Sequence, residues 1–583
     1  MPTQTCVGTY LTTRLKQLGV NHLFSVPGDY TSDFLEIVDT LSPPDRIHRI
    51  GNCNELNAGY AADGYARANG LGAVAVTTGV GAFSLLNAIG GSYVENIPVV
   101  AIIGTLSNTK LLDEINAGEL YHHTVNSEDT NRTAYSPVTV AFERISNPMT
   151  APAQIDGALT ACISQSRPVA IEIMEDCYYM PCPAPVGNLT PVPQYEPLSV
   201  LKGIASSNSY AAEIVKAVEN ASNAIYDMLS NSNHPVLWTG KEIGTYHLEA
   251  KFLEFQDLVK APIISSLLGK AVIPEDHPWY IGMHDGAFTS SHTKEFIGNC
   301  DSLIGLGLWN TDLNTFGAKT ITPGNISRVF ASRNMVKVGD ELFVQVALEH
   351  LLDSLIDLVK TKGYKPVWQQ PTAALKPPAP PSSAPITYDH FFYLLNNYIS
   401  KDNLLVADIG LSTFGGSSSV TITRQKGFLA QTIWASIGWS VPAGLGASFT
   451  DQTRALVVVG DGAFKLTCQA ISTMVMEGRN TVVFVLNNKV YGVEQMLLNP
   501  APYKQGSTAK FEEANVLQDW DYVSLMNAFS NNASNAQSAN VNTVQDLHNV
   551  LETIDQNPNS TFLVNINLNE RDYPSPWQQF VNK

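Results

Sequence analysis

The sequence is poor in basic residues for its length. It has 35 Lys and Arg against 53 Asp and Glu over 583 residues, a formal net charge of −18 at pH 7. A chain with this excess of negative charge repels polyanions, so a nucleic-acid backbone or an anionic membrane surface is excluded as a general partner. An anionic small-molecule substrate would need local positive charge or a bound cation to overcome the same repulsion.

Long hydrophobic runs are also missing. No apolar stretch approaches the roughly 18 residues that a membrane-spanning helix needs, so we expect no membrane partner. Residues 1–19 have the pattern of an amphipathic helix and lack the apolar core of a signal peptide. The seven cysteines are scattered, odd in number and without the close spacing of metal ligands. We therefore expect a protein of a reducing compartment, the cytoplasm.

Length and apolar content indicate several packed domains. Hydrophobic residues make up 44% of the chain and charged residues 15%, which is typical of a globular protein. A chain of 583 residues is too long for one core, and about three or four domains are expected. Two proline-rich stretches, 182–199 and 365–387, are typical of linkers. They predict domains at 1–185, 195–362 and 386–583.

Each predicted domain alternates short apolar runs with helix-length segments, which is the pattern of parallel sheets with crossover helices. The runs are 73–77 and 98–103 in the first domain, 235–239, 262–266, 302–306 and 328–331 in the second, and 403–409, 455–459 and 481–486 in the third. The prediction is an α/β fold of three consecutive doubly wound parallel-sheet domains. The middle domain has no GxGxxG at a strand–helix turn, so we expect it to be structural or regulatory. We expect the Ser- and Asn-rich stretch 530–542 to be a surface loop.

The most informative segment is 454–488. An apolar run leads into Gly460-Asp461-Gly462, a helical pattern covers 464–477, and a second apolar run leads into Asn487-Asn488. In such a βαβ unit both strands point the same way, so Asp461 and Asn488 should meet at one edge of the sheet. A lone Gly-Asp-Gly is also ordinary turn chemistry, and the surrounding strand–helix–strand pattern is what favours a site.

The residue types at this edge suit a metal and a phosphate. A carboxylate and an amide oxygen are hard ligands that Mg²⁺ accepts while it takes further oxygens from a phosphate. Gly460 and Gly462 allow the backbone to approach a ligand, and the helix start near Ala463 offers free N–H groups to an anion. A nucleotide site would instead need a Gly-Lys-Ser/Thr turn, which is absent.

Further segments give the whole chain a family resemblance. They are Val26-Pro-Gly-Asp-Tyr30, the run 53–67 (CNELNAGYAADGYAR), His122-His123, Ile437-Gly-Trp-Ser440 and Tyr491-Gly-Val-Glu494. Together with GDG…NN, the sequence resembles the thiamine-diphosphate-dependent 2-keto acid decarboxylases that act on pyruvate, indolepyruvate, phenylpyruvate or branched-chain substrates. The resemblance implies a pyrimidine-binding domain, a middle domain and a diphosphate-binding domain, in the order of the three predicted blocks.

The resemblance assigns residues to the cofactor. Asp461, Asn488 and the backbone carbonyl of Val490 match the family's Mg²⁺ ligands, and Tyr491 follows them at the cofactor. Glu55 matches the glutamate that hydrogen-bonds the aminopyrimidine ring and favours its imino tautomer. Ile437 matches the apolar residue that wedges between the two rings of the bent cofactor. Ala435 stands where relatives commonly have glycine, at a position whose function is a backbone carbonyl.

A second set matches the family's proton-handling residues: Asp29, His122, His123 and Glu494. Neighbouring side chains on a strand point to opposite faces, so both histidines can serve one site only if they lie in a loop or turn. We expect one imidazole to face the substrate and the other to be linked to Asp29, with Glu494 near the departing carboxylate.

The pocket residues of the family map onto Thr413, Val493 and Leu497. Narrow bacterial pyruvate decarboxylases tend to have tryptophan at the first position, whereas fungal ones have a small residue, so threonine predicts a relaxed pocket for pyruvate and larger 2-keto acids.

Relatives of the yeast type are activated through a middle-domain cysteine. This chain has no cysteine between Cys182 and Cys300, so we expect no such trigger.

Two other functions compete with simple decarboxylation. A thiamine-diphosphate carboligase of the acyloin or acetolactate type would use a second acceptor, whereas the His122-His123 pair with Glu494 favours protonation and aldehyde release. A non-catalytic homologue would lack Glu55, Asp461 or Glu494, and all three are present.

The family also implies a homo-oligomer, a dimer or tetramer, in which Glu55 and Asp461 reach one cofactor from different subunits.

Overall fold

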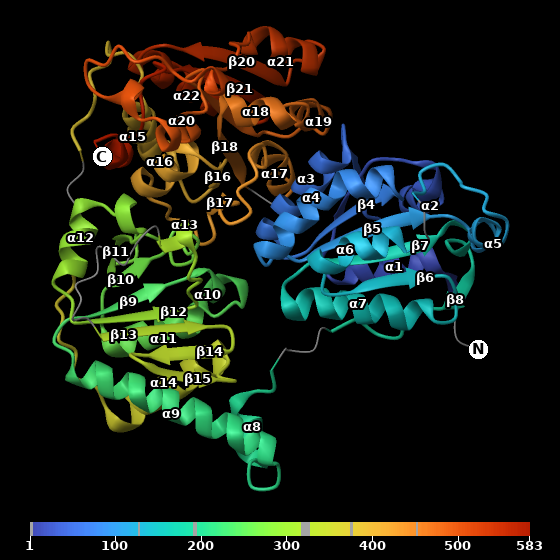
Figure 1. The fold of residues 1–583 in the computed structure, drawn as a ribbon, viewed down its shortest axis with the longest axis horizontal. Coiled ribbons are helices and arrows are strands. Elements are labelled where there is room, and N and C mark those ends of the chain that lie inside the picture. The colour runs from blue at the N-terminus through green and yellow to red at the C-terminus, as the bar shows by residue number, and fades with distance from the viewer. Residues whose placement is uncertain are drawn as a thin grey trace.

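Three sheets in series, each covered by helices, make up the molecule. A computed structural model describes residues 4–125, 129–190, 195–315, 327–372, 377–450 and 453–582. Each sheet forms a separate layer, coloured blue to cyan, green to yellow and orange to red from the N-terminus (Figure 1). The prediction of three α/β domains is confirmed.

The N-terminal sheet has the strand order β3-β2-β4-β5-β7-β6, and all its strands run parallel. Its central strands are buried on both faces and read as continuous apolar runs for that reason. Its strands are β2 (His22–Ser25), β3 (His48–Gly51), β4 (Gly72–Thr77), β5 (Val99–Thr105), β6 (Phe142–Ile145) and β7 (Val169–Met174), and its helices are α1 (Val7–Gln17), α2 (Ser32–Thr40), α3 (Glu55–Asn69), α4 (Val80–Val94), α5 (Asn108–Ala117), α6 (Thr130–Tyr135) and α7 (Ala151–Gln165). A separate antiparallel pair joins β1 (Gln4–Cys6) to β8 (Pro181–Pro183).

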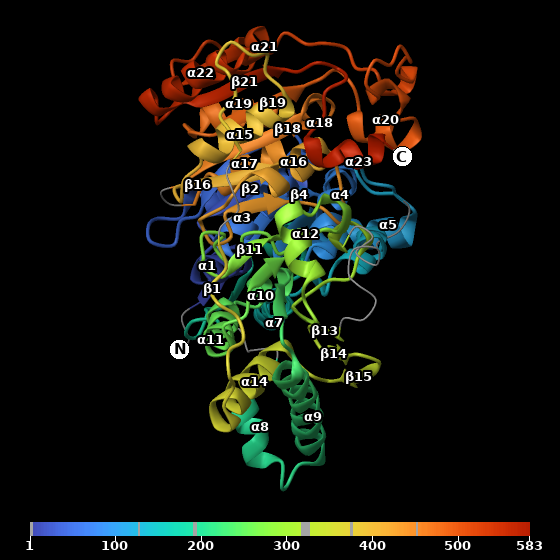
Figure 2. The ribbon, with the colours of Figure 1, turned by 90° about the vertical axis from the view of Figure 1, so that its left-hand side faces the viewer.

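The middle sheet has the order β11-β10-β9-β12-β13-β14-β15 and is not parallel throughout. Strand β14 is antiparallel to β13 and to β15, so a hairpin closes one edge of an otherwise parallel sheet. Its strands are β9 (Pro235–Thr239), β10 (Ile263–Ser265), β11 (Tyr280–Met283), β12 (Ser302–Leu306), β13 (Ser327–Ser332), β14 (Met335–Val338) and β15 (Glu341–Val344), and its helices are α8 (Leu198–Ile204), α9 (Ser209–Asn231), α10 (Lys241–Thr245), α11 (Glu249–Val259), α12 (Ser291–Gly298), α13 (Asp312–Thr315) and α14 (Leu348–Lys362). Helices α8, α9 and α14 lie at the end of the molecule opposite the C-terminal sheet (Figure 2).

The C-terminal sheet has the order β17-β16-β18-β19-β21-β20, again all parallel. Its strands are β16 (Asn403–Ala407), β17 (Phe428–Ala430), β18 (Arg454–Gly460), β19 (Val482–Asn487), β20 (Ala536–Val541) and β21 (Thr561–Asn567), and its helices are α15 (Tyr388–Tyr398), α16 (Leu411–Ser419), α17 (Ser440–Ala447), α18 (Asp461–Thr467), α19 (Ala470–Met476), α20 (Gly492–Leu498), α21 (Tyr522–Ser530), α22 (Val544–Gln556) and α23 (Gln578–Val581). The expected loop at 530–542 is wrong, because β20 crosses it. An edge strand that is half exposed tolerates the polar residues that suggested a loop.

The three sheets lie within the ranges 1–185, 195–362 and 386–583, and the boundaries themselves stay a prediction. In the described part of the chain, no helix is both long enough and apolar enough to span a bilayer.

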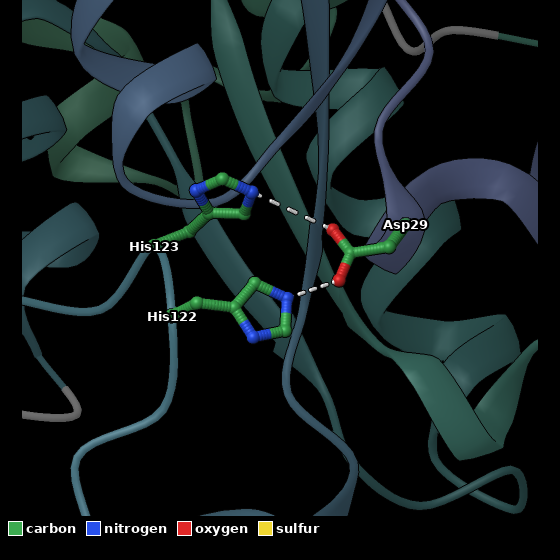
Figure 3. A group of neighbouring side chains, drawn as sticks. All are labelled: Asp29, His122 and His123. Atoms are coloured by element: carbon green, nitrogen blue, oxygen red, sulfur yellow. Dashed lines mark hydrogen bonds and ion pairs between the residues drawn. The ribbon is translucent and has the colours of Figure 1, made fainter.

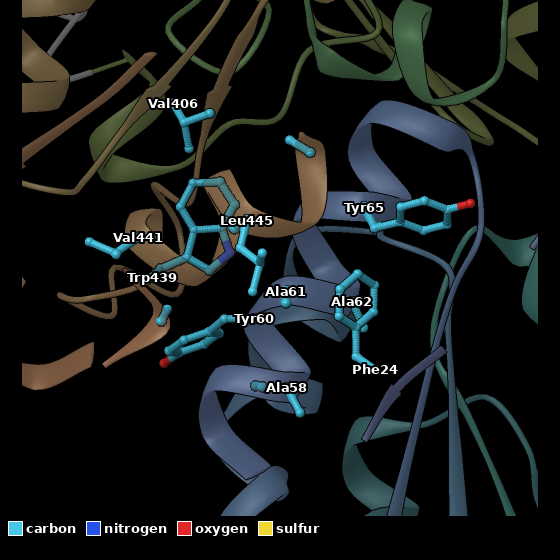
Figure 4. Close-up of a cluster of buried hydrophobic side chains, with 14 of the residues drawn as sticks. Phe24, Ala58, Tyr60, Ala61, Ala62, Tyr65, Val406, Trp439, Val441 and Leu445 are labelled. Atoms are coloured by element: carbon cyan, nitrogen blue, oxygen red, sulfur yellow. The ribbon is translucent and has the colours of Figure 1, made fainter. Parts of the chain in front are cut away.

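Helices α3 and α17 join the first and last domains through one shared hydrophobic core. Trp439 and Leu445 meet Tyr60 and Ala61 of α3 there (Figure 4). The helices approach closely enough that a Cβ on Gly446 would stand 1.9 Å from the carbonyl oxygen of Ala61. This contact therefore requires glycine, and it anchors the helix that begins at Glu55.

Candidate active site

The unit β18–α18–β19 brings the two polar motifs together as predicted. Gly460 of β18 lies opposite Leu486 of β19 in a parallel ladder, so the residues that follow both strands leave the sheet at one edge. The backbone N–H of Lys489 donates to Oδ2 of Asp461 over 3.1 Å. The helix begins at Asp461 itself and breaks after Thr467, so the predicted helix 464–477 is in fact the pair α18 and α19.

A cavity of about 270 Å³ opens at this edge. It is lined by Leu313, Tyr388, Ile409, Gly410, Leu411, Ser412, Phe414, Ala435, Ile437, Gly460, Asp461, Gly462, Ala463, Asn488, Val490, Tyr491, Gly492, Val493 and Glu494. All lie in the C-terminal domain except Leu313, which comes from the middle domain, and none of the described residues of the N-terminal domain lines the cavity. Every residue assigned to the diphosphate end of the cofactor is in this set.

Asp461 is a buried carboxylate that forms no ion pair with another described residue. Its exposed fraction is 2%, and within the described ranges no ion pair reaches it. Burial raises the pKa of its carboxyl to about 6, against the opposing charge of Lys465 and the N–H groups of Gly462 and Lys489. The Lys465 ammonium instead donates to the carbonyl of Gln518. A cation at this position would relieve the cost of burying the carboxylate.

Asn488 is also left incomplete. Its Oδ1 accepts the N–H of Val490 at 3.3 Å, whereas its buried Nδ2 has no hydrogen-bond partner. Buried amide groups in folded proteins are normally paired, so an unpaired one points to a ligand.

The loop that carries Ile437 is held by a residue the sequence did not single out. Asp408 follows β16, and its two oxygens accept the N–H groups of Gly438 at 3.0 Å and Ser440 at 2.9 Å. Burial raises the pKa of Asp408 to about 6, and these N–H bonds oppose the rise. Ala435, in the same loop, has φ of 55°, the left-handed region that favours glycine.

A second cluster lies in the N-terminal domain. Asp29 begins the short 3₁₀ turn after β2. His122 and His123 lie in a turn after α5, which is the placement that lets both side chains serve one site. Figure 3 shows both imidazoles, rather than one, facing the Asp29 carboxylate: His122 Nε2 bonds Oδ2, and His123 Nε2 lies 3.7 Å from Oδ1. Burial tends to raise the pKa of Asp29, but the hydrogen bond from His122 and the imidazole charges lower it overall.

Glu55 is the first residue of α3, where the side chain of its N-cap Asn54 accepts the N–H of Asn57 at 2.8 Å. Its Oε1 would stand 3.4 Å from a Cβ built on Gly81, at the start of α4. Neither Glu55 nor the Asp29 cluster lines the Asp461 cavity. The candidate residues of one chain therefore form two separate groups, which we call the N-terminal half-site (Glu55 and the Asp29 cluster) and the C-terminal half-site (the Asp461 cavity).

The expected substrate residues are only partly at the cavity. Val493 and Glu494 line it. Thr413 is fully buried and donates its hydroxyl to the carbonyl of Asp408 at 2.6 Å, and Leu497 is 63% exposed on α20. Neither of these two lines the cavity of the single chain, and their pocket role stays a prediction.

Comparison with known proteins agrees with this geometry. The chain matches the thiamine pyrophosphate enzyme N-terminal TPP-binding domain over residues 5–129, the central domain over 222–348 and the C-terminal TPP-binding domain over 408–565. It is 31% identical to pyruvate decarboxylase 1 of Pisum sativum over 94% of this chain and 87% of that one. It is 30% identical to pyruvate decarboxylase 1 of Zea mays, over 95% of this chain and 86% of that one. It is 29% identical to pyruvate decarboxylase isozyme 1 of Saccharomyces cerevisiae, over 90% of this chain and 88% of that one.

The chain belongs to the thiamine-diphosphate-dependent 2-keto acid decarboxylases. The residues present fit the cofactor of this family. The matched C-terminal domain contains the buried, unpaired carboxylate of Asp461 and the unsatisfied amide of Asn488 at one cavity, and a cation-bound diphosphate would complete both.

Sequence reasoning missed several residues that shape the decarboxylase cavity. They are Leu313, Tyr388, Ile409, Gly410, Leu411, Ser412 and, as a positioning residue, Asp408. Asp408 and Gly410 carried a usable signal, because a polar residue and a glycine directly after a buried strand are the same pattern that revealed Asp461. Tyr388 and Leu313 carried none, since each lies far from the motifs in sequence.

Proposed function

We propose that the chain converts a 2-keto acid to the aldehyde and carbon dioxide, without oxidation, using thiamine diphosphate anchored through Mg²⁺. The observation that carries the proposal is the buried Asp461 carboxylate beside the unsatisfied Asn488 amide in one cavity. Asp461, Asn488 and the carbonyl of Val490 are the residues that would hold the cation, as oxygen ligands suited to Mg²⁺.

Thiamine diphosphate, when bound, supplies the electron sink that the loss of carbon dioxide requires. The chain supplies orientation and protons around it. Ile437 and Ala435 present an apolar side chain and a backbone carbonyl at the cavity wall, on a loop fixed by Asp408. Glu494 faces the same cavity, so its carboxyl can hold a proton beside the reacting carbon.

The remaining proton-handling groups belong to the N-terminal half-site. We assign Glu55 to the pyrimidine ring and Asp29, His122 and His123 to the substrate side. These residues do not line the Asp461 cavity of their own chain, which supports an assembly in which a second copy brings them to it. The proposed unit is thus a dimer or tetramer with its active sites between subunits.

Exposed apolar side chains beside each half-site support this assembly. Val80 and Phe83, 58% and 41% exposed, lie on the helix next to Glu55. Leu466 is 48% and Leu498 71% exposed on the two helices at the Asp461 cavity. Large exposed apolar groups around an incomplete site are typical of a protein interface.

We propose a relaxed substrate range that includes pyruvate and larger aliphatic or aromatic 2-keto acids. The cavity wall at Val493 and Phe414 is apolar, and none of its described lining residues is a tryptophan. We also propose a cytoplasmic enzyme. All seven cysteines are free, as expected in a reducing compartment.

The test is reconstitution with thiamine diphosphate and Mg²⁺, followed by kcat/KM for pyruvate, 2-ketoisovalerate, phenylpyruvate and indolepyruvate. Free aldehyde in step with carbon dioxide is the expected product. Acyloin as the main product would favour the carboligase alternative, and no turnover with any of the four would contradict the proposal.

Thr413→Trp should depress turnover of the large substrates more than that of pyruvate. An equal loss of turnover with both would show that Thr413 does not belong to the pocket.

A further inference from the structure

The Asp29–His122–His123 cluster has the composition and spacing of a metal site that differs from the Mg²⁺ site. Among the described residues, it is the only group of three or more His, Cys, Asp or Glu side chains whose ligand atoms all lie within 4.8 Å of one another. Its two imidazoles present Nε2 to the two oxygens of one carboxylate (Figure 3). Three ligand atoms therefore converge on one small volume.

The ligands are held in place before any ion arrives. The His122 ring stacks on Tyr30, with ring centroids 5.1 Å apart and an interplanar angle of 18°, and Tyr30 is fully buried. The Tyr30 hydroxyl donates to the His122 carbonyl at 3.3 Å. A Cβ on Gly79 would stand 1.6 Å from the His123 carbonyl oxygen, so the backbone of the turn lies directly against α4. A preorganised ligand set binds a metal with less loss of entropy.

In the single chain the cluster is open to solvent, and in the proposed assembly it faces the cavity that the substrate must enter. The side chains of His122, His123 and Asp29 are 61%, 36% and 46% exposed. An incoming ion can reach all three and keep a position for water, as in sites with three protein ligands.

We propose that Asp29, His122 and His123 bind one divalent transition-metal ion, with Zn²⁺ as the reference, and that this ion inhibits the enzyme. Two imidazoles and one carboxylate suit Zn²⁺, Co²⁺ or Ni²⁺, whereas Mg²⁺ takes oxygen ligands. Bonds form from the metal to both Nε2 atoms and to a carboxylate oxygen, and the His122–Asp29 hydrogen bond breaks. A proton on Nε2 passes to solvent while Nδ1 of the same ring takes one up, so that both rings bind the metal as neutral imidazoles. The inhibitory effect rests on the proposed function, because the same three groups are assigned there to proton handling; the binding does not.

Binding is measured first, on untagged protein without thiamine diphosphate and with excess Mg²⁺, by calorimetric titration with Zn²⁺ and by visible absorption with Co²⁺. One ion per chain is expected. His122→Ala, His123→Ala and Asp29→Ala should each weaken the affinity at least about tenfold. The matched control is His548→Ala, an exposed histidine on α22, which should leave it unchanged. Equal Zn²⁺ binding by the native chain and the double variant His122→Ala/His123→Ala, or no binding by the native chain, would overturn the site.

Turnover is measured second, on the reconstituted enzyme. Zn²⁺ should abolish decarboxylation at the occupancy seen by titration, and a chelator followed by fresh Mg²⁺ and cofactor should restore it. If Zn²⁺ binds and the enzyme keeps its full turnover, the proposed inhibition is wrong, although the proposed binding site is not. A chain that binds Zn²⁺ but never decarboxylates would contradict the proposed function alone.

Discussion

The backbone N–H of Lys489 donates a hydrogen bond to Oδ2 of Asp461 over 3.1 Å and so joins the two motifs of the C-terminal half-site. The bond holds the Asp461 carboxylate at the edge of the cavity but brings it no positive charge. Burial raises the pKa of Asp461 to about 6, which means that the protein alone disfavours its charged form. A cation bound beside Asp461 would favour the charged form of this carboxyl.

Asp461→Asn should change stability and cofactor binding in opposite directions. The amide keeps an acceptor for the Lys489 N–H but removes a buried charge that costs about 2–3 kcal/mol at neutral pH. We expect the cofactor-free variant to unfold at a higher denaturant concentration than the parent. Its affinity for thiamine diphosphate with Mg²⁺, measured by fluorescence titration, should fall at least about tenfold. Native affinity in this variant would remove Asp461 from the metal site.

The α3–α17 contact predicts a large effect from one methyl group. In Gly446→Ala the new Cβ would stand 1.9 Å from the Ala61 carbonyl oxygen and 2.8 Å from the Tyr65 nitrogen. Both are backbone atoms of α3 that cannot turn aside, so we expect a loss of about 2–3 kcal/mol in unfolding free energy. Activity should fall as well, because α3 begins at Glu55.

The matched control for this variant is Gly203→Ala on α8, where a Cβ would meet nothing within 4 Å. Alanine in a helix is favoured over glycine by roughly 0.5–1 kcal/mol, so this variant should be as stable as the parent or more so. Two variants with equal stability would show that the helices separate at no cost.

The sequence predicted the parts of the molecule that depend on local pattern. Buried parallel strands read as apolar runs, and Asp461 and Asn488 could be placed because each follows such a run. Strand β20 was not predicted, because it lies at the edge of the sheet and an edge strand need not be apolar. The α3–α17 contact and the position of Tyr388 depend on long-range packing, which no local pattern encodes.

Ala435→Gly should not destabilise the protein. Ala435 has φ of 55°, and the left-handed conformation costs a residue with a Cβ about 1–2 kcal/mol. Glycine removes this strain, but the unfolded chain with glycine has more conformational entropy to lose on folding, which costs roughly 0.4–1 kcal/mol. The net change should therefore lie between zero and about 1.6 kcal/mol of stabilisation. Ala217→Gly, within α9, is the control and should lose about 1 kcal/mol. Denaturant titration measures both; equal losses would contradict the strain at Ala435.

Glu242 should make the middle domain sensitive to pH. Burial raises the pKa of its carboxyl from 4.5 to about 7, against the opposing hydrogen bond from Trp309. The folded chain therefore keeps this proton at a pH where the unfolded chain has lost it. Stability falls as pH rises from about 4.5 through about 7, by a total of about 3 kcal/mol at most.

Glu242→Gln removes this cost while its amide oxygen can still accept from Trp309 Nε1, now 2.8 Å from the carboxylate. The variant should be more stable than the parent at pH 8 and similar at pH 5, as measured by thermal unfolding. The control is Glu219→Gln, on the exposed face of α9. Its difference in stability from the parent should be the same at pH 5 and at pH 8. A Glu242→Gln difference that does not depend on pH would show that the carboxyl is solvated in the folded protein.

In the proposed assembly, Asp461 of one chain and Glu55 of another hold a single thiamine diphosphate. Co-expression of Glu55→Gln with Asp461→Asn tests it most directly, because each variant spoils a different half-site. Each variant alone should be inactive. Random pairing of the two chains should restore about one quarter of native turnover, since half of the dimers would contain one intact site. A co-expressed mixture that assembles yet stays as inactive as either variant would contradict the account.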